Sequence, residues 1–250
     1  MNREVSQAIN HLDRFGFCLL EGRMPGKEAE RFAEACLALH ADPSNDRYKT
    51  GDEHYQTLFG LLNLDERSWA YAAHPETVAV AQHFLGPSCR VVEACSKPTW
   101  PGAQDQPLHV DSAGNFHQVP DVPWMINSIW LLTDFTIENG ATGVVPLSHR
   151  SRLKRPPNDV ISDHDLVRPI TGKAGSVVMW HGGLFHIARR NLSEEIRVGL
   201  NIAYYPRWFN NWVEGGHQPV WSETYGRMPD EMKALCTGKR GSTREDVYEV

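Results

Sequence analysis

Arg90-Val91-Val92-Glu93-Ala94-Cys95 is the segment at which the periodicity of this chain changes. Before it, apolar residues recur at the spacing of an amphipathic helix, whereas the segment itself begins a series of extended runs. Clusters of Gly, Pro and Asn separate the later runs, which lie at 127–132, 144–145, 176–180 and 198–205. The sequence therefore predicts helices first and a strand-dense second half.

The residues before this segment predict three helices and one strand. Apolar residues have helical spacing over 3–15, and the short apolar run 17–20 is typical of a buried strand. Pro25 begins a second helix that extends to Leu39, and Pro75 begins a third that ends at Gly86.

This order predicts a mainly β fold with flanking helices. We expect a double-stranded β-helix (jelly-roll, cupin-like) core with the N-terminal helices packed on one sheet. The length of 250 residues suits a single domain over 1–250. Within it we expect a mainly helical buttress at 1–88, the jelly-roll core at 89–206 and a C-terminal lid or tail at 207–250.

Composition excludes several classes of function. A net charge of -6 argues against a nucleic-acid surface, which would carry a basic stripe. The polar start of the chain has no signal-peptide pattern, and no apolar run is long enough to span a membrane. The five cysteines have no Cys-x-x-Cys spacing, which favours a reducing compartment. We expect a cytoplasmic protein with no nucleic-acid or membrane partner, and we leave its oligomeric state open.

His-x-Asp occurs three times, and the local structure distinguishes the copies. His11–Asp13 and His40–Asp42 lie in or at the ends of predicted helices, where positions i and i+2 point about 200° apart and cannot share a metal. His109 and Asp111 stand beside an extended stretch, where i and i+2 face the same way. Only the third pair is therefore a candidate for metal binding.

Two downstream residues complete a recognisable set. His186 with His109 and Asp111 would make the 2-His-1-carboxylate triad of a non-haem iron site. The fork of the Arg197 guanidinium suits a bound carboxylate. A hairpin over 191–195 is expected to bring Arg197 opposite His186.

Three other polar residues have competing interpretations. His181 competes with His186 for the distal position; its odd offset of five places it on the opposite face, unless Gly182-Gly183 breaks the alternation. His149 follows a turn and is interpreted as a residue that braces a loop. Asp134 is interpreted as a bracing group for the turn that follows it.

Four segments resemble one known family. They are Asp13–Leu20, the metal motif Gln106–Asp111, the turn Glu138-Asn139-Gly140 followed by Pro146-Leu147-Ser148-His149-Arg150, and the set His186, Asn191 and Arg197. On these motifs the chain resembles the phytanoyl-CoA dioxygenase (PhyH-like) family of Fe(II)/2-oxoglutarate oxygenases, from about Phe15 to Trp208. Leu147 stands where the family usually has Gly, and Ala188 where some members have a Ser that helps to hold 2-oxoglutarate.

The resemblance implies a dioxygenase that uses Fe(II), 2-oxoglutarate and O2, with ascorbate as the reductant in vitro. His109, Asp111 and His186 would be the metal ligands and catalytic residues, and Arg197 would clamp the far carboxylate of 2-oxoglutarate. Gln106 and Tyr205 are further candidates for cofactor binding, although Tyr205 is equally well explained as a half-buried aromatic residue of a strand.

Hydroxylation of a small molecule, with release of succinate and CO2, is the reaction that we expect. Desaturation, cyclisation or another oxidative outcome, a non-catalytic metal-binding jelly roll and a hydrolytic zinc site remain as alternatives. The loop 149–166 and the segment 208–226 are long enough to cover the mouth of the barrel. Because the second is rich in aromatic residues, Trp208 and Trp212 are candidate contacts to a compact, natural-product-like substrate.

Overall fold

The computed structural model describes residues 2–111, 120, 122–158, 161–208 and 220–236. Within these ranges the strands form a seven-stranded sheet of order β1-β8-β5-β10-β4-β3-β2 and a three-stranded sheet of order β7-β6-β9. The strand pairs within these ranges are antiparallel. The strands are β1 (Phe17–Leu20), β2 (Lys49–Gly51), β3 (Gln56–Leu58), β4 (Arg90–Thr99), β5 (Ile126–Leu131), β6 (Gly143–Val144), β7 (Arg168–Pro169), β8 (Val177–His181), β9 (His186–Ile187) and β10 (Arg197–Tyr205).

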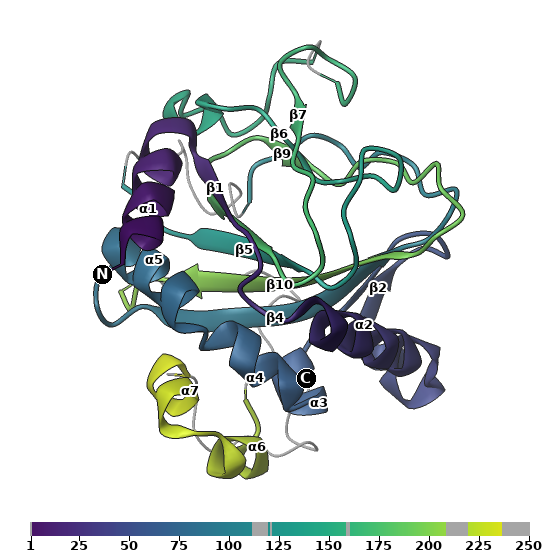
Figure 1. Cartoon of the computed structure of the whole chain (residues 1–250), viewed down its shortest axis with the longest axis vertical. Helices are drawn as coiled ribbons and strands as arrows, with labels where there is room; N and C mark the ends of the chain where they lie inside the picture. The colour runs from purple at the N-terminus through teal and green to yellow at the C-terminus, as the bar shows by residue number, and fades with distance from the viewer. Residues whose placement is uncertain (1, 112–119, 121, 159–160, 209–219, 237–250) are drawn as a thin grey trace.

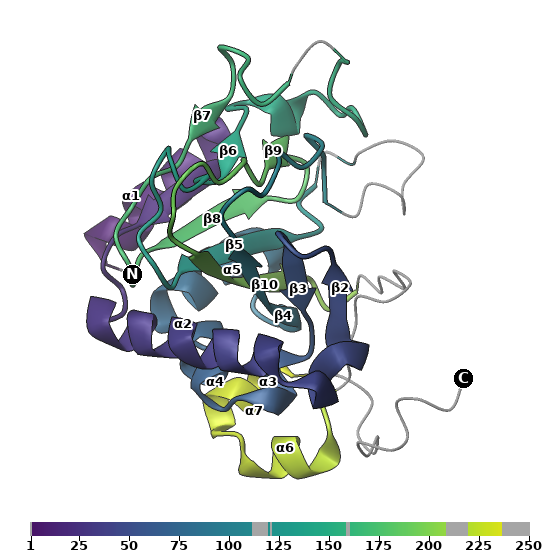
Figure 2. The ribbon, with the colours of Figure 1, turned by 90° about the vertical axis from the view of Figure 1, so that its right-hand side faces the viewer.

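Helices cover one face of the large sheet, and the small sheet lies over the other face. In Figure 1 the small sheet is above the large sheet, while the helices α3, α4, α6 and α7 lie below it; Figure 2 shows the same layers from the side. The helices are α1 (Arg3–Phe15), α2 (Gly26–Ala41), α3 (Leu61–Leu64), α4 (Arg67–Ala72), α5 (Pro75–Leu85), α6 (Ser222–Arg227) and α7 (Asp230–Leu235), with short 3-10 helices at Pro43–Tyr48 and Ser148–Arg150.

The first helix shows how local sequence determines an element. The side chain of Asn2 caps α1 by accepting a hydrogen bond from the Val5 N–H (2.8 Å). Gly16 ends the helix at φ 89°, a conformation that favours glycine, and its N–H donates to the Leu12 carbonyl. The apolar stripe of α1 is buried, so the helix predicted over 3–15 is confirmed.

Alternation along β10 separates the structural core from the site. Val198, Leu200 and Ile202 belong to the apolar cluster that packs the helices onto the large sheet. The intervening residues, beginning with Gly199 and Asn201, therefore face the space between the two sheets. A second apolar cluster lies in that space and includes Ile129, Leu131, Phe135, Val178 and Trp180.

The expected jelly-roll class is confirmed, with two corrections. The first 88 residues are mainly helical and include the predicted strand β1, but they also supply β2 and β3, which were not predicted, to the large sheet. In addition, β9 pairs with β6, whereas β10 pairs with β4 and β5. The expected hairpin with Arg197 opposite His186 is therefore wrong, because the turn at 191–195 carries the chain from one sheet to the other.

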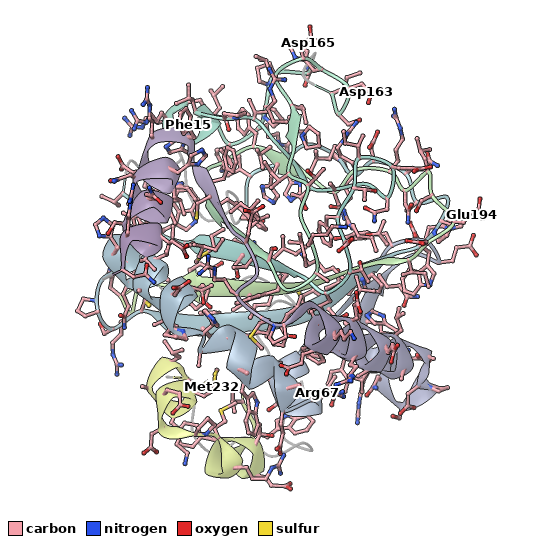
Figure 3. All side chains as sticks on the ribbon, viewed as in Figure 1. Phe15, Arg67, Asp163, Asp165, Glu194 and Met232 are labelled. Carbon is pink, nitrogen blue, oxygen red and sulfur yellow. The ribbon has the colours of Figure 1, made fainter. Side chains whose placement is uncertain are left out.

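The C-terminal helices do not cover the barrel mouth. Met228, Met232 and Leu235 belong to the cluster beneath the large sheet, and α7 packs against β4. Figure 3 shows Met232 on the helical side and the loop residues Asp163 and Asp165 at the far end of the molecule. The lid expected at the C-terminus does not hold for 220–236. None of the helices in the described ranges is long and apolar enough to cross a lipid bilayer.

Candidate active site

Three of the predicted ligands meet between the sheets. His109 and His186 form an antiparallel bridge in which each backbone N–H donates to the other residue's carbonyl (3.0 Å). Asp111 lies beside both imidazoles, with its Oδ2 3.5 Å from His186 Nε2 and its Oδ1 3.9 Å from His109 Nε2. One ligand atom from each residue lies within 4.8 Å of the others, so the set suits a single metal ion.

Backbone carbonyls orient both imidazoles for this purpose. His109 Nδ1 lies 2.8 Å from the Pro107 carbonyl, and His186 Nδ1 lies 3.0 Å from the Leu184 carbonyl. A carbonyl only accepts, so each Nδ1 carries the proton and each Nε2 keeps its lone pair for a metal. Burial lowers the pKa of His186 to about 4, which keeps this imidazole neutral at physiological pH. The donor set therefore fits Fe(II).

Two strand residues hold the Asp111 carboxylate from behind. Asn127 Nδ2 and Trp180 Nε1 each donate to Asp111 Oδ2 at 3.0 Å. Burial alone would raise the pKa of Asp111, but the imidazoles of His186 and His109 and the Asn127 hydrogen bond lower it overall. The amide of Asn127 is held in turn by Asn201, whose Nδ2 donates to Asn127 Oδ1 (2.7 Å). These three residues were not predicted from the sequence.

Arg197 is a buried cation with no acidic partner among the described residues. Its side chain donates to the Gly140 carbonyl and to Thr99 Oγ1 (2.7 Å), and its Nε has no partner. The guanidinium lies 4.7 Å from the centroid of the Phe135 ring. Burial lowers the pKa of Arg197 to about 10. A buried and uncompensated guanidinium requires an anion, and a ligand carboxylate would satisfy it.

The turn at 138–140 explains one of the motifs in structural terms. Asn139 is buried and closes the turn, accepting from the Thr136 N–H (2.8 Å) and donating to the Asp134 carbonyl (2.8 Å). Gly140 has φ 81°, and a Cβ there would lie 2.2 Å from the Arg189 carbonyl oxygen. Only glycine fits, and its own carbonyl is the group that accepts from Arg197.

Comparison with known proteins agrees with this geometry. Residues 12–199 match the family model for phytanoyl-CoA dioxygenase (PhyH). The chain belongs to this family. Family membership and the triad together identify it as an Fe(II)/2-oxoglutarate-dependent dioxygenase.

Similar proteins include a fungal enzyme and two solved structures. The dioxygenase af480 of Aspergillus fumigatus is 28% identical over 225 residues, which cover 82% of this chain and 67% of that protein. The epimerase SnoN from nogalamycin biosynthesis, in complex with Fe3+, alpha ketoglutarate and nogalamycin RO, has a TM-score of 0.65 at 16% identity, covering 81% of this chain and 84% of that chain. EctD from S. alaskensis with bound Fe has a TM-score of 0.69 at 19% identity, covering 80% of this chain and 76% of that chain.

Four histidines that the sequence analysis weighed outside this PhyH-family triad do not join it in the structure. His181 is buried, its Nδ1 accepts from the Gly183 N–H (2.9 Å), and it lies outside the metal-binding group found among the described residues. His149 contacts the end of α1 through the Asp13 carbonyl (3.3 Å), so it braces its loop as predicted. His11 lies on α1, and His40 is a buried residue of α2 next to Gln56 (3.1 Å).

The remaining predicted site residues of the dioxygenase are Gln106, Tyr205, Trp208 and Trp212. The Gln106 N–H donates to the Ala188 carbonyl (3.0 Å), which attaches the metal-motif segment to the chain after β9. Tyr205 is buried in an apolar cluster and pairs with Arg90, eight residues from Arg197 at the opposite end of β10. Trp208 is 65% exposed. Trp212 lies outside the described residues. Their contacts to cofactor or substrate stay predictions.

The inner face of β4 carries two charged residues that the sequence analysis did not identify. Lys97 and Glu93 are partly exposed although β4 lies inside the large sheet. Lys97 pairs in register with Gly199, and Glu93 with Ala203. Burial acts to lower the pKa of Lys97, but the neighbouring Tyr55, Cys95, Glu93 and Asp111 raise it overall, so the ammonium form is favoured. The alternation along β4 could have suggested this face, but not what it faces.

Proposed function

We propose that this dioxygenase hydroxylates a small, natural-product-like molecule and releases succinate and CO2. One observation carries the proposal: a metal triad shares its interior with a buried guanidinium that lacks an acidic partner among the described residues. The triad alone would also suit zinc. The unpaired guanidinium adds a place for a carboxylate co-substrate.

His109, Asp111 and His186 would hold Fe(II), and Arg197 would bind the C5 carboxylate of 2-oxoglutarate. When bound, the iron supplies O2 activation, which the decarboxylation of 2-oxoglutarate drives. Lys97 would provide a second positive charge for this dianion. Its ammonium has no ion pair or hydrogen bond within the described ranges. Lys97 pairs with Gly199, which is the next residue after Arg197 on the inner face of β10. The residues present therefore suit both the metal and the co-substrate.

The surrounding side chains would keep the site ordered and dry. The hydrogen bonds from Asn127 and Trp180 hold one oxygen of Asp111, leaving the other for a metal. Ile129, Leu131 and Phe135 line the space between the sheets and exclude water from it. Exclusion of water strengthens the electrostatic attraction between Arg197 and a carboxylate.

Features of the chain and of its structural neighbour support the small-molecule class. SnoN, whose fold is similar, is described as an epimerase from nogalamycin biosynthesis and binds nogalamycin RO. The net charge of -6 disfavours a nucleic-acid substrate. We further propose that residues 1–250 form one domain, that the protein works in the cytoplasm, and that Gln106, Tyr205, Trp208 and Trp212 contribute to ligand contacts.

A substrate screen with Fe(II), 2-oxoglutarate and ascorbate, measured as succinate release, tests this proposal. Asp111→Ala and His186→Ala should abolish succinate release while the protein stays folded, because each removes a metal ligand. His83→Ala, on the exposed side of α5, is the matched control and should keep full activity. Full activity in the His186 variant would contradict the assignment and move attention to His181.

A further inference from the structure

Glu93 lies at the same level of the sheet as the groups that hold the metal carboxylate. The register places Glu93 beside Ala203, Ala203 beside Asn127, and Asn127 beside Trp180. Asn127 and Trp180 are the two donors to Asp111 Oδ2. Residues that pair across neighbouring strands form a row, and their side chains point to the same face of the sheet. Glu93 therefore lies on the face on which Asn127 and Trp180 hold Asp111.

The residue between Glu93 and Asn127 in this row is small. Ala203 has only a methyl group, and it separates Glu93 from Asn127 across two strand spacings, about 10 Å between backbones. The next row pairs Cys95 with Asn201. Ala203 is buried in an apolar cluster that includes Val110 and Phe185, whereas Glu93 is partly exposed, so the accessible group of this row is the Glu93 carboxylate.

Glu93 has unused hydrogen-bonding capacity. Within the described ranges its carboxylate accepts one hydrogen bond, from the Cys95 thiol to Oε1 (3.2 Å), and it makes no ion pair. A thiol is a weak donor, and an ionised carboxylate can accept about four hydrogen bonds. Burial raises the pKa of Glu93 overall, and the Lys97 ammonium limits that rise. An acceptor of this kind in a barrel interior is complementary to a donor on a ligand.

The charges around Glu93 indicate that the donor is neutral. Between Arg197 and Glu93, the inner face of β4 and β10 carries two cations and one anion: Arg197, Lys97 and Glu93. Asp111 adds a second anion. These four charges cancel. Fe(II) and the 2-oxoglutarate dianion, which the site would hold, also cancel each other. A charged substrate would disturb this balance, whereas a hydroxyl group would not.

We propose that Glu93 is a specificity residue that anchors the prime substrate through a neutral hydroxyl group beside the metal site. The proposal rests on the function proposed above. It predicts an alcohol as the substrate class, with the hydroxyl group fixing which carbon atom lies nearest the metal. The upstream reaction must therefore be one that leaves or installs a free hydroxyl group on a compact ring system.

The test measures binding to protein loaded with Zn(II) and 2-oxoglutarate, so that no turnover occurs. The probes are 2-indanol, indane and 2-aminoindane, followed by larger ring alcohols with their deoxy counterparts, and binding is measured by ligand-observed NMR. The wild type should prefer alcohols over deoxy counterparts by about tenfold or more. Glu93→Leu should remove this preference, and Glu93→Gln, which keeps one acceptor oxygen, should retain part of it.

Several controls separate this inference from the proposed function. Glu53→Leu changes a side chain that is 87% exposed and should leave the preference intact. Titration of 2-oxoglutarate into the wild type and each variant loaded with Zn(II) alone checks the site itself: no binding in the wild type would reject the proposed function. If 2-oxoglutarate binds, the Glu93 assignment is overturned by equal binding of alcohols and deoxy counterparts, by preference for 2-aminoindane, by binding of no probe, or by an unchanged preference in Glu93→Leu.

Discussion

The Asp111 carboxylate shows how much of the site depends on residues that are not metal ligands. Asn127 and Trp180 direct one of its oxygens, and Asn201 directs Asn127. The ligand set was predictable, because His and Asp at this spacing on an extended segment are distinctive. The supporting residues were not, because Asn127 and Trp180 lie in apolar runs and their partner is distant in sequence.

The backbone of Leu147 has a strained conformation. It has φ 68°, in the left-handed region, at the position where the family usually has Gly. Such a conformation costs a residue with a Cβ about 1–2 kcal/mol. Leu147→Gly should therefore increase the free energy of unfolding by about 1 kcal/mol, after the greater flexibility of Gly in the unfolded chain is subtracted. Chemical denaturation measures this change.

The matched control for Leu147 is a second exposed leucine in the same loop. Leu153 is 48% exposed and does not have a positive φ. Leu153→Gly should leave the unfolding free energy unchanged or lower it. A loss of stability in Leu147→Gly as large as in the control would contradict the proposed strain.

His181 should make stability depend on pH. Burial, and then the neighbouring His149, lowers the pKa of His181 from 6.5 to about 3. Between these two values the unfolded chain binds a proton at His181 that the folded protein does not. The contribution of His181 to the free energy of unfolding is therefore fully present above pH 6.5 and falls as the pH is lowered toward 3. The slope from this residue approaches about 1.4 kcal/mol per pH unit.

A variant isolates this contribution from those of the other histidines. His181→Asn keeps an acceptor for the Gly183 N–H but cannot titrate. Unfolding free energies at pH 7 and pH 5 should differ less in the variant than in the wild type, with His83→Asn on exposed α5 as the control for loss of a histidine. Parallel pH dependence in the wild type and His181→Asn would show that His181 does not cause it.

At the scale of elements, long periodic segments were predictable and short ones were not. The helix over 3–15 and the strands β4, β5, β8 and β10 have enough residues to show a period. β2, β3, β7 and β9 have two or three residues each, too few to show a period, and they are defined by pairing: β2 with β3, and both β7 and β9 with β6. The crossing from β9 to β10 was mispredicted for a related reason: a turn signal does not reveal whether the next strand stays in the same sheet.

The C-terminal helix α7 contributes to the core beneath the large sheet. Met232 is fully buried there and belongs to the same cluster as residues of β10. Met232→Ala should lower the free energy of unfolding by about 2–5 kcal/mol, because it removes buried methylene groups and leaves a cavity. It should leave 2-oxoglutarate binding to the folded protein unchanged, because α7 lies across the sheet from the site.

Denaturant unfolding together with a binding titration measures both effects of Met232→Ala. Glu231→Ala, at an exposed neighbouring position on the same helix, is the control and should change stability little. An unchanged unfolding free energy in Met232→Ala, or weakened 2-oxoglutarate binding to the folded variant, would contradict the placement of α7 beneath the large sheet, across from the site.

At the scale of the whole molecule, the two faces of the large sheet have different tasks. Helices bury its outer face, and its inner face, with the small sheet, surrounds the metal triad. Asp105 ties the loop before the metal motif to Ser162 (2.5 Å) and Arg190 (3.0 Å), so the long loop after β6 is anchored near the site. The loop itself was predicted from its length and composition. Its anchoring contacts were not, because they join residues that are far apart in the sequence.

The most direct test of the account is a calorimetric titration of 2-oxoglutarate, without oxygen, into protein loaded with Fe(II). The wild type should bind 2-oxoglutarate. Asp111→Ala should lose the metal, while Arg197→Met should keep the metal and weaken 2-oxoglutarate binding by about 100-fold or more, because the partner of a buried charge is lost. Arg197→Lys, which keeps the charge but not the fork, should lie between them. Unchanged 2-oxoglutarate binding in Arg197→Met, or unchanged metal binding in Asp111→Ala, would contradict the account.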